Sequence, residues 1–345
     1  MEEKKFDINT IVGFLLIGAI LLYMLWQNQP TPEQLEAQKA EKEKIEQIEI
    51  DNKSSDIVSQ QDISLENAIT KFTIANSEDS LGLSELQNRL GSFAYSGTLL
   101  SATDETTVIE NEVLKLTISN KGGYIVEAKL KKLTIYNGTP VYLIKDGNSS
   151  LNLQFYSENR LLNSQDLYFE PSISSNGDNK VLSMKLKTSE NNFIEYRYEL
   201  IPDNYMLGFS IKTQGLENII NTSQPIYLDW NFIGYRQSKS ISYENRYTRL
   251  TYEYENEDKH SKLSAASDDD ELVKDLNWMN FRQHFFSSML LTDTAFKEVA
   301  LSSIDLVKDE EVDTLYTKRY GAKMLLEPNL GNLSYNMNMY YGPTE

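Results

Sequence analysis

Residues 194–200 read Ile-Glu-Tyr-Arg-Tyr-Glu-Leu, so every second side chain is apolar or aromatic and each one between them is charged. Successive side chains of a β-strand point to opposite faces, and this alternation therefore predicts a strand with one face buried. The same period of two predicts further half-buried strands at Leu114–Ile118, Leu182–Leu186, Ile226–Phe232 and Tyr335–Tyr341. With 21 Tyr and 13 Phe in 345 residues, the composition also favours strands over helices.

Three short sequences mark tight connections between such strands. They are Asn137-Gly138, Asp146-Gly147 and Asn176-Gly177, pairs that tolerate the positive φ angles of hairpin turns. Many strands joined by tight turns favour an antiparallel β-sandwich, and the chain is long enough for one large domain of this kind. We expect a mainly β protein, with this sandwich and one or two minor helices in residues 97–345.

The periodicity is undecided in one part of the C-terminal half. Apolar residues between Trp278 and Leu291 fit neither a helical nor a strand spacing throughout, and Glu271–Asp275 is open in the same way. Just before this part, Asp268–Glu271 lacks the alternating ligands, central Gly and distant Glu of an EF-hand loop. Because acidic side chains favour helix N-termini, we expect a solvated acidic turn that precedes a helix.

Charge and cysteine content exclude several classes of function. The chain carries 51 acidic and 33 basic side chains, a formal net charge of −18, so the whole molecule repels phosphate backbones and anionic lipid head groups at long range, and nucleic acid is not an expected partner. It has no cysteine, which excludes disulfides, thiolate catalysis and Cys-ligated metals. Two histidines cannot build a three-His metal site, and we expect neither a metal nor a cofactor.

An apolar stretch near the N-terminus has the length of a membrane span. Ile11–Trp26 is almost continuously apolar, and about 20 such residues cross the hydrocarbon core as a helix. Tyr23 and Trp26 fit an interfacial aromatic belt. A cleaved signal peptide is the alternative, but Leu25–Pro30 is too bulky and polar for a signal peptidase site. Lysines stand on both sides of the span, so charge counting leaves its orientation open.

The span divides the N-terminal third of the chain. We assign residues 1–7 to a short tail, 8–28 to a transmembrane helix and 29–96 to a charged and polar linker. Within the linker, Glu33–Glu49 favours a helical stalk and Asn52–Ser80 is too polar to bury much surface. Leu81–Tyr95 can form a short amphipathic helix.

Four stretches carry a family likeness: Asn9–Pro32, Glu110–Leu116 with Asn120–Gly123, Asn277–Ser288 and Met339–Pro343. None is a catalytic motif, and the specific feature is their order and spacing together with the predicted anchor and linker. Taken together they resemble YidC insertases of the Bacteroidetes type. Gly122-Gly123 matches neither a Walker loop nor a dinucleotide fingerprint, and we interpret it as a strand connection that needs positive φ or close backbone approach.

The resemblance implies a periplasmic β-supersandwich similar to galactose mutarotases, an inner membrane location and a cytoplasmic N-terminus. It also implies nascent membrane proteins and components of the Sec translocon as partners, with the lipid bilayer contacted through the N-terminal helix. In the family, the Tyr-Gly-Pro stretch closes this domain, and five further helices follow with the hydrophilic groove that receives substrates. Because the sequence stops at Glu345, we expect an interaction module that assists insertion and does not insert proteins by itself.

The mutarotase likeness raises an enzyme hypothesis, because mutarotases use a histidine and a carboxylate beside a sugar ring. His260 lies in the charged stretch Glu253–Lys262, which we expect to be a loop, and His284 lies between Gln283 and Phe285. A catalytic histidine needs a partner within hydrogen-bond reach, and solvation or ordinary packing explains both residues without chemistry. We therefore expect no catalytic, cofactor-binding or metal-binding residue. The alternative function is a periplasmic module that binds carbohydrate or an extended peptide in a cleft of the sandwich.

Overall fold

The computed structural model describes residues 80–255 and 259–344. The predicted tail, the transmembrane helix of residues 8–28 and the helical stalk lie outside the described residues. Within the described part, no helix is long and apolar enough to cross a membrane.

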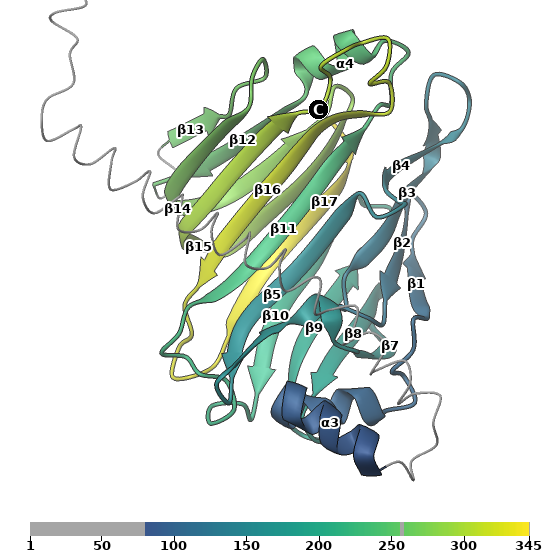
Figure 1. Ribbon diagram of the computed structural model, residues 1–345. Coiled ribbons are helices and arrows are strands. Elements are labelled where there is room, and N and C mark those ends of the chain that lie inside the picture. Colours follow the sequence, from purple (N-terminus) through teal and green to yellow (C-terminus); the bar gives the residue numbers. More distant parts are fainter. Residues whose placement is uncertain (1–79, 256–258, 345) are drawn as a thin grey trace, which may run out of the picture. The chain divides into compact units, whose positions relative to one another are not determined.

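Strands dominate the described residues, as predicted (Figure 1). Before the first strand come α3 (Ser80–Leu90) and the 3-10 helix η1 (Gly91–Thr98). The first half of the strands comprises β1 (Thr106–Glu110), β2 (Leu114–Ser119), β3 (Ile125–Thr134), β4 (Pro140–Ile144), β5 (Ser149–Ser157), β6 (Arg160–Asn163), β7 (Glu170–Asn176), β8 (Asn179–Lys187) and β9 (Phe193–Leu200), with the 3-10 helix η2 (Ser164–Asp166) after β6. The second half comprises β10 (Met206–Gln214), β11 (Ile226–Tyr235), β12 (Arg249–Tyr254), β13 (Lys259–Lys262), β14 (Asp269–Arg282), β15 (Phe286–Asp305), β16 (Tyr316–Leu326) and β17 (Ser334–Pro343), with helix α4 (Ile241–Tyr247) before β12.

In the described part of the chain, the strands form two antiparallel sheets. The smaller sheet has the order β1-β2-β3-β4, and the larger has thirteen strands. The larger sheet divides at β15, because residues 286–292 pair with β17 whereas residues 299–305 pair with β16. One arm continues as β17-β10-β9-β8-β7 and the other as β16-β11-β5-β6, while β14 pairs with β15 along its length. The two arms and the small sheet together make the predicted antiparallel sandwich.

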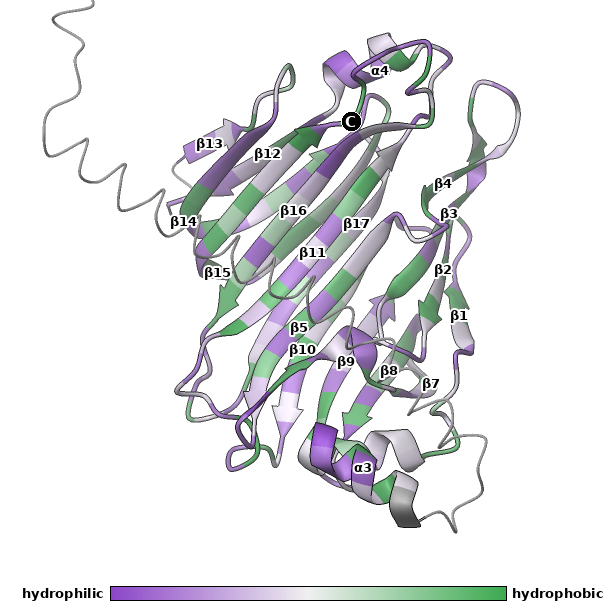
Figure 2. Ribbon diagram, viewed as in Figure 1, coloured by the Kyte–Doolittle hydropathy of each residue, from purple (hydrophilic) through white to green (hydrophobic). Residues whose placement is uncertain are grey.

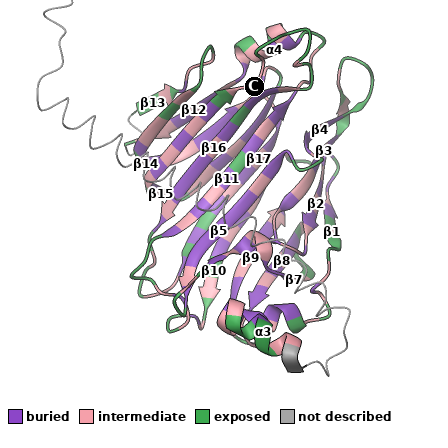
Figure 3. Cartoon of the chain, in the orientation of Figure 1, coloured by how far each residue is buried: buried purple, intermediate pink, exposed green. Residues whose placement is uncertain are grey.

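The predicted strand pattern is confirmed residue by residue in the core. The apolar positions of β9 are Ile194, Tyr196, Tyr198 and Leu200, which are all buried, while the charged residues between them are half-buried. The same alternation appears in β2, β8, β11 and β17, and along many strands of Figures 2 and 3 green, hydrophobic positions coincide with purple, buried ones. Burial of these apolar faces is the main force that holds the sheets together.

Local sequence signals also hold at the turns. Asp146 and Gly147 have φ angles of 51° and 76°, and Gly138 and Gly177 also have positive φ. The Gly122-Gly123 pair needs both properties that the sequence suggested, because Gly123 has a φ of 68° and a Cβ there would lie 2.9 Å from the ring of Phe169. The pair is a close-packed strand connection.

The short helix predicted within Leu81–Tyr95 is present as α3, followed by η1. Their side chains Leu86, Leu90 and Phe93 are buried in the same core as the sheets, and the ring of Phe93 lies 5.1 Å from that of Phe155 on β5. Packed structure therefore starts inside the range 29–96 that the sequence analysis assigned to a linker.

Two expectations for local structure were wrong. Asp268–Glu271 precedes no helix, because Asp269 begins β14 and Asp269–Lys274 pairs with Glu298–Ser303 on β15. This long-range pairing outweighs the local preference of acidic residues for helix N-termini. The charged stretch around His260 is not wholly a loop, since β13 pairs with β12 there. Trp278–Leu291, left open between helix and strand, is the β14–β15 hairpin.

Candidate interaction surfaces

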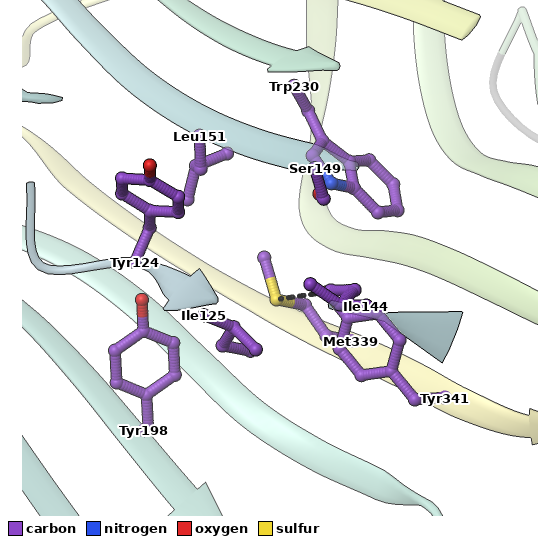
Figure 4. A pocket seen from close by; sticks show the side chains of 9 residues that line it. All are labelled: Tyr124, Ile125, Ile144, Ser149, Leu151, Tyr198, Trp230, Met339 and Tyr341. Carbon is purple, nitrogen blue, oxygen red and sulfur yellow. Dashed lines mark hydrogen bonds between the residues drawn. The ribbon is translucent and has the colours of Figure 1, made fainter. Parts of the chain in front are cut away.

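Buried side chains from the sheets meet around a small cavity of about 10 Å³. Its lining comes from the small sheet and from both arms of the large sheet (Figure 4). The lining residues are Tyr124, Ile125, Ile144, Ser149, Leu151, Tyr198, Trp230, Met339 and Tyr341. One water needs about that volume, so the cavity has no room for a sugar or a peptide.

Buried aromatic rings build the walls of this interior. The ring of Trp230 lies 4.3 Å from that of Phe281, and Phe281 stacks on Tyr320 at 5.1 Å. The Tyr198 hydroxyl donates a hydrogen bond of 2.8 Å to the carbonyl oxygen of Gly123. Burial raises the pKa of Tyr198 well above its usual value, so this phenol is a protonated structural donor.

The two histidines occupy separate environments. The Nε2 atom of His260 lies 3.3 Å from the Oε1 atom of Glu253, but the His260 side chain is 67% exposed on the β12–β13 hairpin. His284 lies in the turn between β14 and β15 and packs among aromatic rings. Neither histidine lines the interior cavity, so the geometry expected for a mutarotase-like acid and base is not assembled there.

The acidic stretch before β14 forms turn hydrogen bonds. An Asp268 carboxylate oxygen accepts from the backbone N–H of Asp305 at 2.8 Å, and Asp269 accepts from the N–H of Ser264 at 2.6 Å. Among the described residues, no group of three or more His, Asp or Glu side chains is arranged to hold a metal ion.

A polar hollow of about 390 Å³ lies over strands β7, β8 and β9. Its lining is formed by Glu170, Ser172, Ser174, Ser175, Val181, Ser183, Lys185, Lys187, Glu190, Glu195 and Arg197. Lys187 is the central charge, with its Nζ atom 2.7 Å from Glu170 and 3.2 Å from Glu190. Hydrogen bonds to these carboxylates, with Glu170 first, raise the pKa of Lys187, and hydrogen bonds from Tyr95 and Lys187 lower the pKa of Glu190. The positive charge of Lys187 is therefore neutralised by the carboxylates of Glu170 and Glu190.

A group of aromatic residues, two exposed and two half-buried, lies at the other end of the domain, and we call it the aromatic patch. It consists of Tyr243 and Tyr247 on α4 and of His284 and Phe285 in the β14–β15 turn. The His284 ring stacks on Tyr247 at 4.7 Å, meets Tyr243 edge-on at 4.9 Å and lies 3.9 Å from Phe285. Burial and, to a smaller extent, Arg282 lower the pKa of His284, so this ring is neutral at pH 7.

Two polar side chains fix α4, and with it half of the aromatic patch. Ser240 caps the helix by accepting from the N–H of Tyr243 at 3.1 Å. The buried carboxylate of Glu244 accepts from the backbone N–H groups of Gln237 and Ser238, both at 2.7 Å. Burial raises the pKa of Glu244, and the hydrogen bonds from Ser238 and Gln237 partly offset this effect.

Neither the aromatic patch nor α4 was predicted from the sequence. A signal was available, because Ser240 is a favoured N-cap residue and Tyr243 and Tyr247 stand four apart, on one face of a helix. Their exposure could not be read from the sequence, because Tyr196 and Tyr198 also stand between charged residues and are nevertheless buried.

A protein-family model described as the YidC periplasmic domain matches residues 106–345. The membrane protein insertase YidC of Parabacteroides distasonis is 32% identical over 98% of this chain and 52% of its own length. The corresponding proteins of Bacteroides fragilis (30% identical, 98% of this chain, 51% of that protein) and Porphyromonas gingivalis (29%, 97% and 53%) are similar as well. The chain thus spans about half the length of these curated relatives.

Solved structures that match part of this chain include a putative aldose 1-epimerase from Escherichia coli, with a TM-score of 0.42 and 10% identity over 70% of this chain and 99% of that chain. Another is galactose 1-epimerase from Lactobacillus acidophilus, with a TM-score of 0.42 and 9% identity over 70% of this chain and 95% of that chain.

Proposed function

We propose, since the chain belongs to the YidC periplasmic-domain family, that it is the anchor and periplasmic domain of a membrane protein insertase and serves there as an interaction module. The observation that carries the proposal is the family match over residues 106–345. Relatives at about 30% identity along 98% of the chain are named as insertases, which supports the same assignment.

The proposed location is the bacterial inner membrane, with the N-terminus in the cytoplasm and the β-domain in the periplasm. Residues 8–28 supply the transmembrane helix, residues 29–96 the linker, whose last part from Ser80 packs on the domain as α3 and η1, and residues 97–345 the periplasmic domain. The apolar span without a signal peptidase site supports this organisation, and the match to a periplasmic-domain family supports the periplasmic side.

The proposed partners are nascent membrane proteins and components of the Sec translocon, with the lipid bilayer contacted through the N-terminal helix. The domain assists their insertion, folding and assembly by contact and carries out no reaction. Two features support a contact function. The interior cavity of about 10 Å³ admits no substrate, and Lys187 in the polar hollow forms ion pairs with Glu170 and Glu190 of the same domain. We therefore expect functional contacts on the outer surfaces of the domain.

The alternative function is binding of carbohydrate or an extended peptide. One observation favours it, because the polar hollow borders β7, which is an edge strand of the large sheet with a run of serines. Edge strands have unpaired backbone groups that can add a peptide strand. The experiment adds oligosaccharides or extended peptides to the full chain in detergent and measures its unfolding temperature. A rise in the unfolding temperature that depends on ligand concentration supports this alternative, and no change argues against it.

Complementation tests the main proposal. In cells depleted of their own insertase, insertion of a reporter membrane protein is scored with this chain alone and with this chain fused to the remaining half of the Parabacteroides distasonis relative. We expect rescue by the fusion and none by the chain alone. The matched control replaces this chain in the fusion by an unrelated anchored β-domain. Rescue by this chain alone, or no rescue by the fusion, contradicts the proposal.

A further inference from the structure

The aromatic patch differs from the other exposed apolar side chains because its members touch one another. Tyr243 is 46% exposed and Phe285 is 51% exposed, and both rings contact the His284 ring within 5 Å. Single exposed apolar residues are normal on a soluble surface, whereas a contiguous group of rings marks a contact site. The patch lies on α4 and on the β14–β15 turn, at the same end of the domain as the C-terminal end of β17 (Figure 1).

Hydrogen bonds to backbone groups fix the two segments that carry the patch. The Glu244 carboxylate fixes α4 to the backbone of the preceding loop, as described above. On the other side, the backbone N–H of Thr344 donates to the carbonyl oxygen of Phe285 at 2.8 Å, which ties the turn to the end of β17. A surface that is already ordered loses little conformational entropy when it binds.

The two segments that carry the patch are basic, whereas the chain as a whole is acidic. Residues 236–249 and 282–285 contain five Arg or Lys and a single acidic residue, Glu244, which is buried. Asp305, whose carboxylate accepts from Asn245 on α4, is itself paired with buried Lys318 at 3.2 Å. The acidic run Asp309–Asp313 between β15 and β16 lies at the same end of the domain, because Leu315 just beyond it accepts from the backbone N–H of Arg236 at 2.9 Å. The basic surface is therefore confined to the patch segments, with Arg246 exposed on α4 beside the rings.

Aromatic rings with polar edges next to basic side chains have the chemistry of a surface that lies at a membrane interface. Tyr and similar rings favour the headgroup level, and Arg or Lys near them attracts anionic lipid. The predicted anchor brings the bilayer within reach, because a linker of the length of residues 29–79 can extend to roughly 170 Å and permits any face of the domain to approach the membrane. Such tethering also lets a weak contact persist.

We propose that the aromatic patch rests on the headgroup region of the bilayer that holds the anchor, with Tyr243 and Phe285 in the interface and Arg246 near lipid phosphates. The inference rests on the proposed function, because it takes the anchored state as its starting point. It assigns the α4 end of the β-domain as the membrane-facing end.

The absence of cysteine makes a site-specific test direct. Full-length Ser242→Cys, labelled with an environment-sensitive fluorophore, reports from α4 and leaves all four rings in place. Ile173→Cys on β7, where the native side chain is 61% exposed, is the matched control, and Leu16→Cys reports whether the anchor is inserted. Each variant is reconstituted into vesicles that carry headgroup spin-labelled lipid as a quencher, with either zwitterionic or anionic lipid as the bulk component.

We expect the Ser242 probe to be quenched at least about twofold more than the Ile173 probe, and more strongly on anionic vesicles. Phe285→Ser and Tyr243→Ser should each remove most of this difference, whereas Leu330→Ser, at an exposed site outside the patch, should not. Arg246→Gln should remove the preference for anionic lipid.

Equal quenching at Ser242 and Ile173, with the Leu16 probe blue-shifted in emission as in hydrocarbon, overturns the inference and leaves the proposed function intact. A Ser242 probe that is shielded from aqueous iodide and is not quenched by lipid also overturns it, because a protein then covers the patch. A Leu16 probe that emits as in water and is quenched by aqueous iodide shows instead that the anchor is not inserted, and the proposed function fails.

Discussion

Asn111 offers the sharpest test of how the two sheets are coupled. It lies between β1 and β2 in the small sheet and is only 8% exposed. Its Nδ2 atom donates to the carbonyl oxygens of Ile201 at 2.7 Å and Asn204 at 2.8 Å, which belong to the β9–β10 connection of the large sheet. Its Oδ1 atom accepts from the backbone N–H groups of Val113 at 2.9 Å and Leu114 at 2.7 Å.

The substitution Asn111→Ala removes all four hydrogen bonds and leaves their partners in a poorly hydrated site. At about 1 kcal/mol for each bond, the loss in free energy of unfolding is about 4 kcal/mol if no water replaces the side chain and about 2 kcal/mol if water reaches half of the partners. Asn111→Asp should lose more at pH 7, because a carboxylate oxygen then faces the two carbonyl oxygens. It should recover part of the loss in acid, where the carboxyl group can donate once.

Urea unfolding of the full chain in detergent, followed by tryptophan fluorescence, measures these losses, since Trp230 is 1% exposed in the core. The matched control is Asn137→Ala, whose amide oxygen binds Thr139 in an exposed turn and whose loss should stay below about 0.5 kcal/mol. A loss below about 1 kcal/mol for Asn111→Ala would refute the idea that this side chain couples the two sheets.

Three further predictions concern single residues. Gly123→Ala places a Cβ 2.9 Å from the ring of Phe169 at a φ of 68°, so it should destabilise the domain by at least about 2 kcal/mol in urea unfolding, and a neutral result would contradict the packing described. Burial raises the pKa of Asp229 to about 6, and Lys323 lowers it only in part. Since this folded-state value exceeds that of the unfolded chain, the carboxyl group favours folding below about pH 4, and this contribution is lost as the pH rises through 6. Asp229→Asn should therefore gain stability over the native chain progressively between pH 4 and 7, by up to about 3 kcal/mol, whereas a gain independent of pH would argue against the raised pKa. Glu244→Ala should lower the free energy of unfolding by about 2 kcal/mol, and Glu244→Gln, which keeps an acceptor oxygen, by clearly less; equal losses would show that the acceptor is not what matters.

Strands whose side chains alternate could be predicted from the sequence because the signal is local. In β9 and β17, apolar side chains at every second position are buried and most side chains between them are half-buried or exposed, so the sequence itself carries a period of two. The turns at Asp146-Gly147 and Gly122-Gly123 were predictable for a similar reason, since a positive φ restricts the residue at that position alone.

The β14–β15 hairpin could not be predicted because its structure depends on distant partners. β15 has β14 on one side and, on the other, β17 for one half and β16 for the rest. Burial along β15 therefore changes with the partner strand, and no single period emerges. The acidic start of β14 is stabilised by pairing with Glu298–Ser303, more than twenty positions away in the sequence. Acidic residues favour a helix N-terminus by only a few tenths of a kcal/mol, which is less than the stabilisation from the backbone hydrogen bonds between β14 and β15.

The sequence did not predict which aromatic side chains of the candidate surfaces are exposed to solvent. Phe281 and Phe285 belong to one short aromatic run, yet Phe281 is completely buried and Phe285 is 51% exposed. The difference arises because β14 ends at Arg282, and the chain then turns before β15 begins. The composition therefore indicated abundant aromatic residues but not which of them could meet a partner.

A filled interior and a rigid surface together favour weak, reversible contacts. The rings of the aromatic patch are fixed by hydrogen bonds to backbone groups, so binding orders little that is not already ordered. A membrane tether raises the effective concentration of the surface near its target, so no single contact needs high affinity. A lipid contact of this kind can form and break repeatedly, because the rings need no rearrangement each time they enter the interface. Variants that only weaken the patch, such as Phe285→Ser, should therefore release the domain from the bilayer without changing its stability.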